Sequence, residues 1–292
     1  MTAPFDFAPL LAPGTPAPAV KWNGFPKYNF VGGHNDADNV PVDALIEAST
    51  AVLRREGPTL ATYGLNSGPL GYRPLREFLS KKLKGHAAIE CSPDEILITS
   101  GSLQGLDLVN TLLLGKGDTI LIEKETYGGA LTRLAKFGVN IVGIPLDNDG
   151  MRMDALKATL ADLKAKGVTP KYIYTIPTVQ NPTGSIMPVE RRKEMIALAR
   201  QYKTLIFEDE CYSDLIWNGK RPCMNSLTGT SRVCTCTAAG AGAAAGLAAF
   251  ADADGAAAAA AAVAVVMARL AANKIDFTSK LLFFIFYYLG GN

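Results

Sequence analysis

The sequence has few of the residues that mark metal-binding, secreted or nucleic-acid-binding proteins. It contains two histidines and five cysteines with no ligand-like spacing, so neither a zinc site nor a disulfide framework is indicated. The formal net charge is +2, which provides no strong field for a nucleic acid or an acidic substrate. We therefore expect a reducing compartment, no metal, no nucleic-acid partner and chemistry on small molecules.

Signals for export and for membrane insertion are also lacking. Residues 1–18 contain no basic stretch followed by an apolar one, which argues against a secretory signal and favours the cytoplasm. Of the two long apolar runs, 256–267 is mostly alanine and 281–289 is too short to span a bilayer. We expect no association with a membrane.

What the chain does contain is a large apolar fraction in an alternating pattern. With 292 residues, 48% of them apolar, it can bury a core in one or two domains. Between residues 45 and 233, short β-branched runs alternate with longer amphipathic segments, which is typical of an α/β fold with a mostly parallel sheet. The predicted strands are Ile96–Thr99, Thr119–Glu123, Asn140–Pro145, Lys171–Ile176 and Thr204–Glu208. The predicted helices are Val42–Arg55, Leu75–Leu83, Leu103–Leu114, Ala130–Phe137, Met153–Ala165 and Val189–Tyr202.

The composition changes abruptly after Val233. Residues 238–272 are nearly all alanine and glycine, and an apolar and aromatic run follows at 282–288. A segment with so few large side chains cannot fill a core, although alanine favours helix locally. We therefore expect an N-terminal arm (1–43), a large α/β domain (44–233) and a tail (234–292) without well-defined structure.

Polar residues follow several predicted strands, where open α/β sheets bind their ligands. The run Ser100-Gly101-Ser102 precedes a helix and so offers backbone N–H groups to a phosphate, although an ordinary serine N-cap explains the same residues. Asp209 ends an apolar run and is suited to hold a proton on a ring nitrogen or to bind a metal, or it is a solvated acid. Tyr127 fits a core aromatic as well as a ligand contact, and 180–184 has the composition of a turn.

Taken in this order, these residues resemble the fold-type-I pyridoxal-phosphate enzymes of the class I and II aminotransferases. The similarity runs from about Tyr28 to Val233 and is greatest to the branch of 2-aminoadipate, kynurenine and aromatic aminotransferases. The stretches that carry it are Ala61-Thr62-Tyr63-Gly64, Gly71-Tyr72-Arg73-Pro74-Leu75-Arg76, Thr99-Ser100-Gly101-Ser102-Leu103-Gln104, Gly117-Asp118, Asn181-Pro182-Thr183-Gly184 and Glu208-Asp209-Glu210-Cys211-Tyr212. The resemblance implies a three-layer α/β/α large domain, bound pyridoxal 5'-phosphate, amino transfer from an amino acid to a 2-oxo acid, and a homodimer.

The resemblance also implies how the reactive end of the cofactor is held. Asp209 matches the aspartate that keeps the pyridine nitrogen protonated, so that the ring acts as an electron sink. Asn181 and Tyr212 match the pair that hydrogen bonds the phenolic oxygen and favours its ionised form. Pro182 is expected to follow a cis peptide bond, as in similar enzymes.

Further matches concern the ring face, the phosphate and the substrate. Tyr127 matches the aromatic residue that stacks on the ring, and Ser102 and Leu103 lie where the helix N-terminus forms the phosphate cup. Tyr63 matches a tyrosine that reaches the phosphate of the neighbouring subunit. Gly33 lies where similar enzymes carry a glycine-rich segment beside the substrate.

The resemblance fails where the Schiff-base lysine is expected, about thirty to thirty-five positions beyond the aspartate. There is no lysine between Lys220 and Lys274, and Lys280, in the dipeptide Ser279-Lys280, comes too late to match. The C-terminal small domain, whose arginine pairs with the substrate carboxylate, is also missing. We hypothesise that the sequence after Val233 is aberrant or truncated and that transfer is impaired.

Other functions fit the same residues. One is a non-catalytic protein or truncated fragment that binds the cofactor, and another is a lyase or acyltransferase on the same fold. Regulators with a similar domain need an N-terminal DNA-binding module, which the residues before Tyr28 are too few to form.

Overall fold

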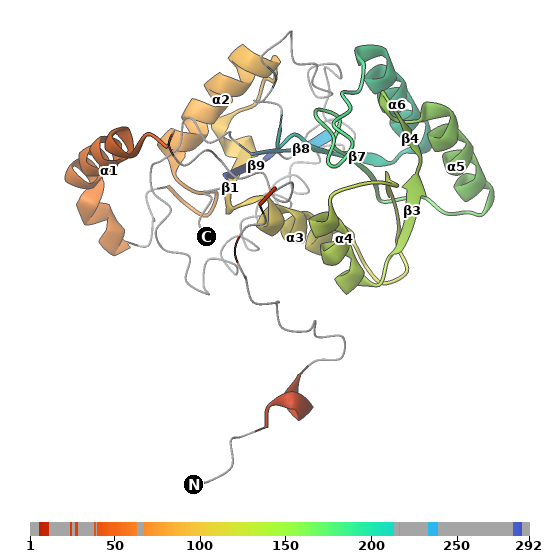
Figure 1. The fold of residues 1–292 in the computed structure, drawn as a ribbon, viewed down its shortest axis with the longest axis horizontal. Coiled ribbons are helices and arrows are strands. Elements are labelled where there is room, and N and C mark those ends of the chain that lie inside the picture. The colour runs from red at the N-terminus through yellow and green to blue at the C-terminus, as the bar shows by residue number, and fades with distance from the viewer. Residues whose placement is uncertain are drawn as a thin grey trace. The chain divides into compact units, whose positions relative to one another are not determined.

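The centre of the described structure is a parallel β-sheet. The computed structural model describes residues 6–11, 24, 27–28, 38, 40–62, 67–212 and 216, together with the backbone of 233–238 and 283–287. Within these residues a seven-stranded sheet has the order β1-β9-β8-β7-β6-β2-β3, and all of its neighbouring strands run parallel (Figure 1). The strands are β1 (Ile96–Ser100), β2 (Thr119–Glu123), β3 (Asn140–Ile144), β6 (Tyr172–Thr175), β7 (Leu205–Asp209), β8 (Val233–Ala238) and β9 (Phe283–Tyr287).

Helices connect the strands as the sequence pattern predicts. The α-helices are α1 (Val42–Glu56), α2 (Arg73–Ala87), α3 (Ser102–Leu113), α4 (Gly128–Leu134), α5 (Met153–Ala165) and α6 (Val189–Tyr202). The short elements are η1 (Ala8–Leu10), η3 (Gly57–Thr62), η4 (Pro93–Glu95), η5 (Ala135–Phe137) and the hairpin strands β4 (Leu146–Asp147) and β5 (Gly150–Met151). Every predicted strand and helix is present, and the bounds of β2, α5 and α6 are those predicted.

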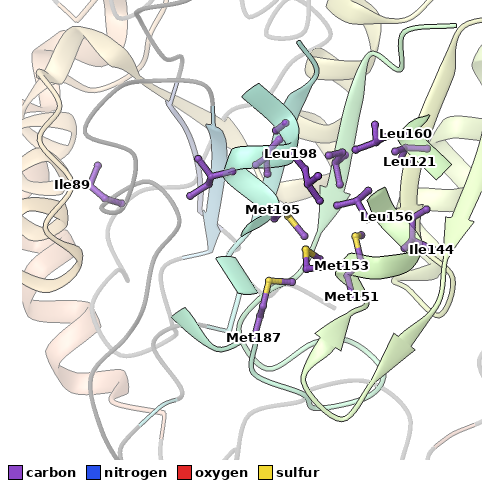
Figure 2. Close-up of a cluster of buried hydrophobic side chains, with 14 of the residues drawn as sticks. Ile89, Leu121, Ile144, Met151, Met153, Leu156, Leu160, Met187, Met195 and Leu198 are labelled. Carbon is purple, nitrogen blue, oxygen red and sulfur yellow. The ribbon is translucent and has the colours of Figure 1, made fainter. Parts of the chain in front are cut away.

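The sheet separates two apolar cores, which gives three layers. Successive side chains of a strand point to opposite faces, so Leu121 packs with α5 and α6 while Ile120 and Ile122 pack with α3 and α4. Figure 1 shows α3 and α4 on one side of the sheet and α2 and α6 on the other. In the first core, Met151, Met153, Met187 and Met195 lie close together beside further aliphatic side chains (Figure 2).

The segment after Val233, for which we expected no well-defined structure, contributes two strands to the sheet. β8 and β9 both come from it and lie between β7 and β1. A strand there needs only backbone partners, and β7 and β1 supply them on either side. The remaining expected tail residues lie outside the described part of the chain.

The residues before the sheet domain form a unit of their own. The chain divides into Met1–Val40 and Pro41–Asn292, and the described part of the first unit includes the single turn η1. Across the residues that the structure describes, no helix combines the length and apolarity needed to cross a bilayer.

Candidate functional site

The carboxyl ends of the strands gather the predicted polar residues at one edge of the sheet. Because β1, β2, β6 and β7 run parallel, the segments that follow them leave the sheet on the same side. These segments contain Ser102, Tyr127, Asn181, Asp209 and Tyr212.

Asp209 is the last residue of β7 and is buried, with 4% of its surface exposed. Tyr174, on the adjacent strand β6, donates a hydrogen bond of 2.7 Å to Asp209 Oδ2. The other oxygen, Oδ1, is buried and accepts no hydrogen bond from any described residue. Burial raises the pKa of the Asp209 carboxyl, against the opposing effects of the Tyr174 hydrogen bond and of the neighbouring Cys211. The reading of Asp209 as a solvated acid is therefore wrong.

Asn181 and Tyr212 meet beside this carboxyl. Asn181 Nδ2 lies 3.4 Å from Tyr212 Oη and donates a hydrogen bond to it. The peptide bond between Asn181 and Pro182 is cis, which confirms that prediction. Burial raises the pKa of the Tyr212 hydroxyl, and the charge of Asp209 adds to this effect while the Asn181 amide opposes it. An amide donor and a hydroxyl thus lie together, and the hydroxyl is near enough to the buried acid for its charge to raise the hydroxyl pKa.

Tyr127 lies immediately before α4 and is partly buried against the core formed with α3 and α4. Its ring also covers Gly129 so closely that a Cβ on that glycine would overlap the ring carbons and the hydroxyl. Tyr127 is near enough to Tyr212 to influence its pKa. The core reading therefore applies to Tyr127, and its contact with a ligand stays a prediction.

The start of α3 differs from the simple serine cap. Gly101 is the N-cap residue, with φ 83° and ψ 169°, and Ser102 occupies the first helical position. No side chain caps this helix, so its first N–H groups keep their capacity to bind an anion. Leu103 packs its side chain against the core and can contribute only its backbone to such a site. The serine N-cap alternative is therefore wrong, because glycine supplies the positive φ that the turn requires.

Three predicted site residues cannot be placed. Tyr63, Gly33 and Lys280 lie outside the described residues. Within the described residues, no group of three or more His, Cys, Asp or Glu side chains is arranged to hold a metal ion.

A buried carboxylate that the sequence reasoning missed lies next to the predicted site. Glu123, at the end of β2, has no exposed surface. It accepts hydrogen bonds from Thr175 Oγ1 at 2.6 Å, from the Ile176 N–H at 3.2 Å and from Gln180 Nε2 at 3.0 Å. Burial raises the pKa of Glu123, and the neighbouring charge of Asp209 raises it further. The signal in the sequence was a charged residue ending a run of four apolar or β-branched ones.

A second buried ionic group holds the loop between β6 and α6. Arg192 is fully buried and donates hydrogen bonds to the carbonyl oxygens of Met187 at 2.8 Å and Pro177 at 2.7 Å. Its guanidinium lies 3.6 Å from Glu208 and 3.3 Å from Glu210. The buried Arg192 guanidinium therefore holds both ends of the loop that carries Asn181, through hydrogen bonds to the Pro177 and Met187 carbonyl oxygens.

The sequence is similar to those of known aminotransferases over most of its length. The family pattern described as aminotransferase class I and II matches residues 27–275, beyond the Val233 at which we expected the similarity to end. Aromatic-amino-acid aminotransferase 1 of Thermococcus litoralis is 36% identical over 192 residues, covering 66% of this chain and 45% of the relative. The 2-aminoadipate transaminase of Thermus thermophilus is 32% identical over 193 residues, with the same coverage of 66% and 45%.

A solved structure shows the same arrangement. The Pyrococcus horikoshii kynurenine aminotransferase, solved in complex with PMP, is 33% identical, with a TM-score of 0.64 over 70% of this chain and 50% of that one. The chain thus spans about half the length of the relatives it matches.

Proposed function

Because the chain belongs to the class I and II aminotransferases, whose members depend on pyridoxal 5'-phosphate, we propose that the edge of its sheet binds this cofactor. We propose further that the protein to which this sheet belongs transfers an amino group from an amino acid to a 2-oxo acid. The relatives with aromatic, 2-aminoadipate and kynurenine names suggest substrates of these classes.

The observation that carries the proposal is the unpaired oxygen of Asp209. A buried carboxylate oxygen without a hydrogen-bond donor is costly, so a ligand that brings a donor to Oδ1 gains binding energy. The protonated nitrogen of a pyridine ring is such a donor, and its positive charge also offsets the buried negative charge. Tyr174 holds the other oxygen, which leaves Oδ1 for the ring.

The surrounding groups fit the rest of the same ligand. Asn181 Nδ2 and Tyr212 Oη are the donors available to the ring oxygen, and Tyr127 is the aromatic residue available to the ring face. The uncapped N–H groups of α3 suit the phosphate, with Ser102 adding a hydroxyl. When bound, the cofactor supplies the electron sink that lets the substrate lose its α-proton. The residues present fit the group.

The finer features belong to the same proposal. The matching tyrosine, Tyr63, supports a homodimer with shared sites, because in similar enzymes this residue reaches the neighbouring phosphate. We place the protein in the cytoplasm, in keeping with its composition.

A second candidate function is cofactor binding without chemistry. The chain has no lysine between Lys220 and Lys274, where the covalent lysine of the family is expected. Lys274 and Lys280 are the nearest later candidates. The two functions share the pocket and differ in whether a lysine reaches it.

One experiment separates them. The purified chain is mixed with pyridoxal phosphate, its absorption spectrum is recorded, and borohydride is added before mass spectrometry of the peptides. An adduct at Lys274 or Lys280 supports the transferase, whereas saturable binding without an adduct supports the binding protein. No saturable binding of either pyridoxal phosphate or pyridoxamine phosphate would refute the site.

A further inference from the structure

The side chain of Gln180 uses all of its hydrogen-bonding capacity inside the protein. It is buried, with 2% of its surface exposed. Its amide nitrogen donates to Glu123 Oε2 at 3.0 Å and to the carbonyl oxygen of Glu125 at 2.7 Å. Its amide oxygen accepts from the N–H of Thr183 at 2.8 Å and from Thr183 Oγ1 at 2.7 Å. A primary amide offers two donors and two acceptor positions, so none is left over.

These contacts join two loops that come from separate strands. Glu125 lies two residues before Tyr127 in the loop after β2, and Gln180 directly precedes Asn181 in the loop after β6. The backbone of Gln180 is fixed as well, since its N–H donates to Ser185 O at 2.9 Å. One side chain therefore links the loop that carries Tyr127 to the loop that carries Asn181.

Glu123 connects this link to the sheet. Its three partners, Thr175, Ile176 and Gln180, all donate to it, which is the pattern that an ionised carboxylate accepts. Thr175 ends β6, so Glu123 bridges two adjacent strands and the loop above them. Charge-assisted hydrogen bonds in a buried place are short and directional, and they hold their partners in one geometry.

We propose that Gln180 and Glu123 are positioning residues that hold Asn181 and Tyr127 at a fixed separation across the ligand ring. The inference rests on the proposed cofactor site and adds the two residues that fix the separation between Asn181 and Tyr127. Neither side chain touches the ligand. Their effect passes through the two loops, to the donor for the ring oxygen and to the ring-stacking residue.

An exchange of the two side chains tests the pair. Gln180→Glu places a second carboxylate 3.0 Å from Glu123 Oε2 and 2.7 Å from the Glu125 carbonyl oxygen, so the two loops repel each other. Glu123→Gln alone replaces one of the two accepting oxygens with an NH2 group, so one of the donors on Thr175, Ile176 or Gln180 loses its acceptor. The double variant, Glu123→Gln with Gln180→Glu, restores one donor and one acceptor between the two positions and keeps the total charge.

The assay uses pyridoxamine phosphate, which needs no covalent lysine. Its dissociation constant is measured by equilibrium dialysis, and its ultraviolet band is followed with pH because the band shifts when the ring hydroxyl ionises. We expect Gln180→Glu to weaken binding about tenfold or more, as for the loss of a hydrogen bond to a charged group. The pH at which the ring hydroxyl of the ligand is half ionised should rise, because the Asn181 amide moves away and no longer stabilises the ionised form. The double variant should recover the part of both changes that comes from the contact between positions 123 and 180, whereas the donor to the Glu125 carbonyl oxygen stays lost.

A matched control distinguishes positioning from a general loss of stability. Asn110 is another buried amide, and it accepts a hydrogen bond of 2.7 Å from Tyr172 in the core, away from the site edge. Asn110→Leu should lower the unfolding midpoint while leaving the affinity and the band of the bound ligand unchanged. If Gln180→Glu behaves in the same way, the positioning role is refuted.

The remaining outcomes are also decisive. Should Gln180→Glu fail to fold, Thr183→Val removes one of the two contacts to the Gln180 amide oxygen, together with the contacts of the Thr183 hydroxyl to Ser185, and we expect about two- to threefold weaker binding with a smaller band shift. An unchanged affinity and band in that variant would overturn the proposal. Absence of binding by the unmodified chain would overturn the cofactor site itself, whereas normal binding by all variants would overturn the positioning pair alone.

Discussion

Replacing Asp209 with asparagine should change stability and ligand binding in opposite directions. Asp209 is 4% exposed, its Oδ2 accepts a hydrogen bond from Tyr174, and its Oδ1 has no hydrogen-bond partner among the described residues. Asparagine keeps an acceptor for Tyr174 and removes the buried charge. Each unit by which burial raises a pKa corresponds to about 1.4 kcal/mol of folding free energy once the group ionises. We therefore expect Asp209→Asn to stabilise the ligand-free protein at pH 7, by about 0.5–2 kcal/mol, the range typical of single stabilising substitutions.

The same substitution should weaken binding of the ligand. Loss of a charge-assisted hydrogen bond to the ring nitrogen costs about 1.5–3 kcal/mol, or about 10- to 150-fold in the dissociation constant of pyridoxamine phosphate. Thermal unfolding with and without this ligand measures both effects, since 1 kcal/mol shifts the midpoint by about 2–4 °C in a domain of this size. Asp162→Asn, on the exposed face of α5, is the control and should change either quantity by less than about 0.5 kcal/mol. A destabilised Asp209→Asn protein with unaltered affinity would refute the reasoning.

The pH dependence of the ligand-free protein follows from the same burial. The pKa values of Glu123, Asp209 and Glu210 are all raised in the folded protein, chiefly by burial. Between the ordinary carboxyl pKa and these raised values, the folded state holds more protons than the unfolded state, so the free energy of unfolding falls as the pH rises. Asp209→Asn should make this decline shallower, which urea unfolding at a series of pH values would show.

Other substitutions test the supports of the site. Arg192→Met leaves two buried carboxylates without their cation and should cost about 3–5 kcal/mol in urea unfolding, whereas Lys193→Met, at an exposed ion pair, should cost less than about 0.5 kcal/mol. Gly129→Ala should displace the Tyr127 ring, destabilise the protein by about 1–3 kcal/mol and weaken pyridoxamine phosphate, while Gly128→Ala, which meets no atom within 4 Å, should do neither. Burial raises the pKa of the Cys91 thiol to about 11, so alkylation at pH 7 followed by mass spectrometry should be slow there, and Cys91→Ser should leave ligand binding unchanged.

Local patterns account for how well the elements could be predicted. The apolar spacing of α5 and α6 and the start of α6 after Pro188 depend on neighbouring residues alone, so their bounds follow from the sequence. β8 and β9 were not predicted, although their own residues are largely β-branched and aromatic, which favours strands. Their place in the sheet depends on pairing with β7 and β1, which lie far away in the chain, and the alanine- and glycine-rich sequence between them carries no pattern that indicates it.

The site residues likewise divide into those indicated by neighbouring residues and those that depend on partners far away in the chain. Asp209 and Asn181 were found because each follows a strand and matches a family motif. Gln180, Glu123 and Tyr174 were not, because each acts through a hydrogen bond that spans more than thirty positions of sequence. Such partners become visible only when the strands are placed side by side.

The order of the strands has a consequence for how the protein comes into being. Among the described strands β9 comes last along the chain, yet it lies between β1 and β8 and is the partner of β1 in the sheet. A ribosome releases β1 and α3 long before β9, so during synthesis β1 waits without its neighbour while β2, β3, β6 and β7 can already pair. The start of α3, whose N–H groups we propose for the phosphate, is therefore joined to the edge that carries Asp209 only when β8 and β9 have been made. We expect nascent chains that lack β9 to protect the β2–β7 core from proteolysis while leaving the segment around β1 open to cleavage.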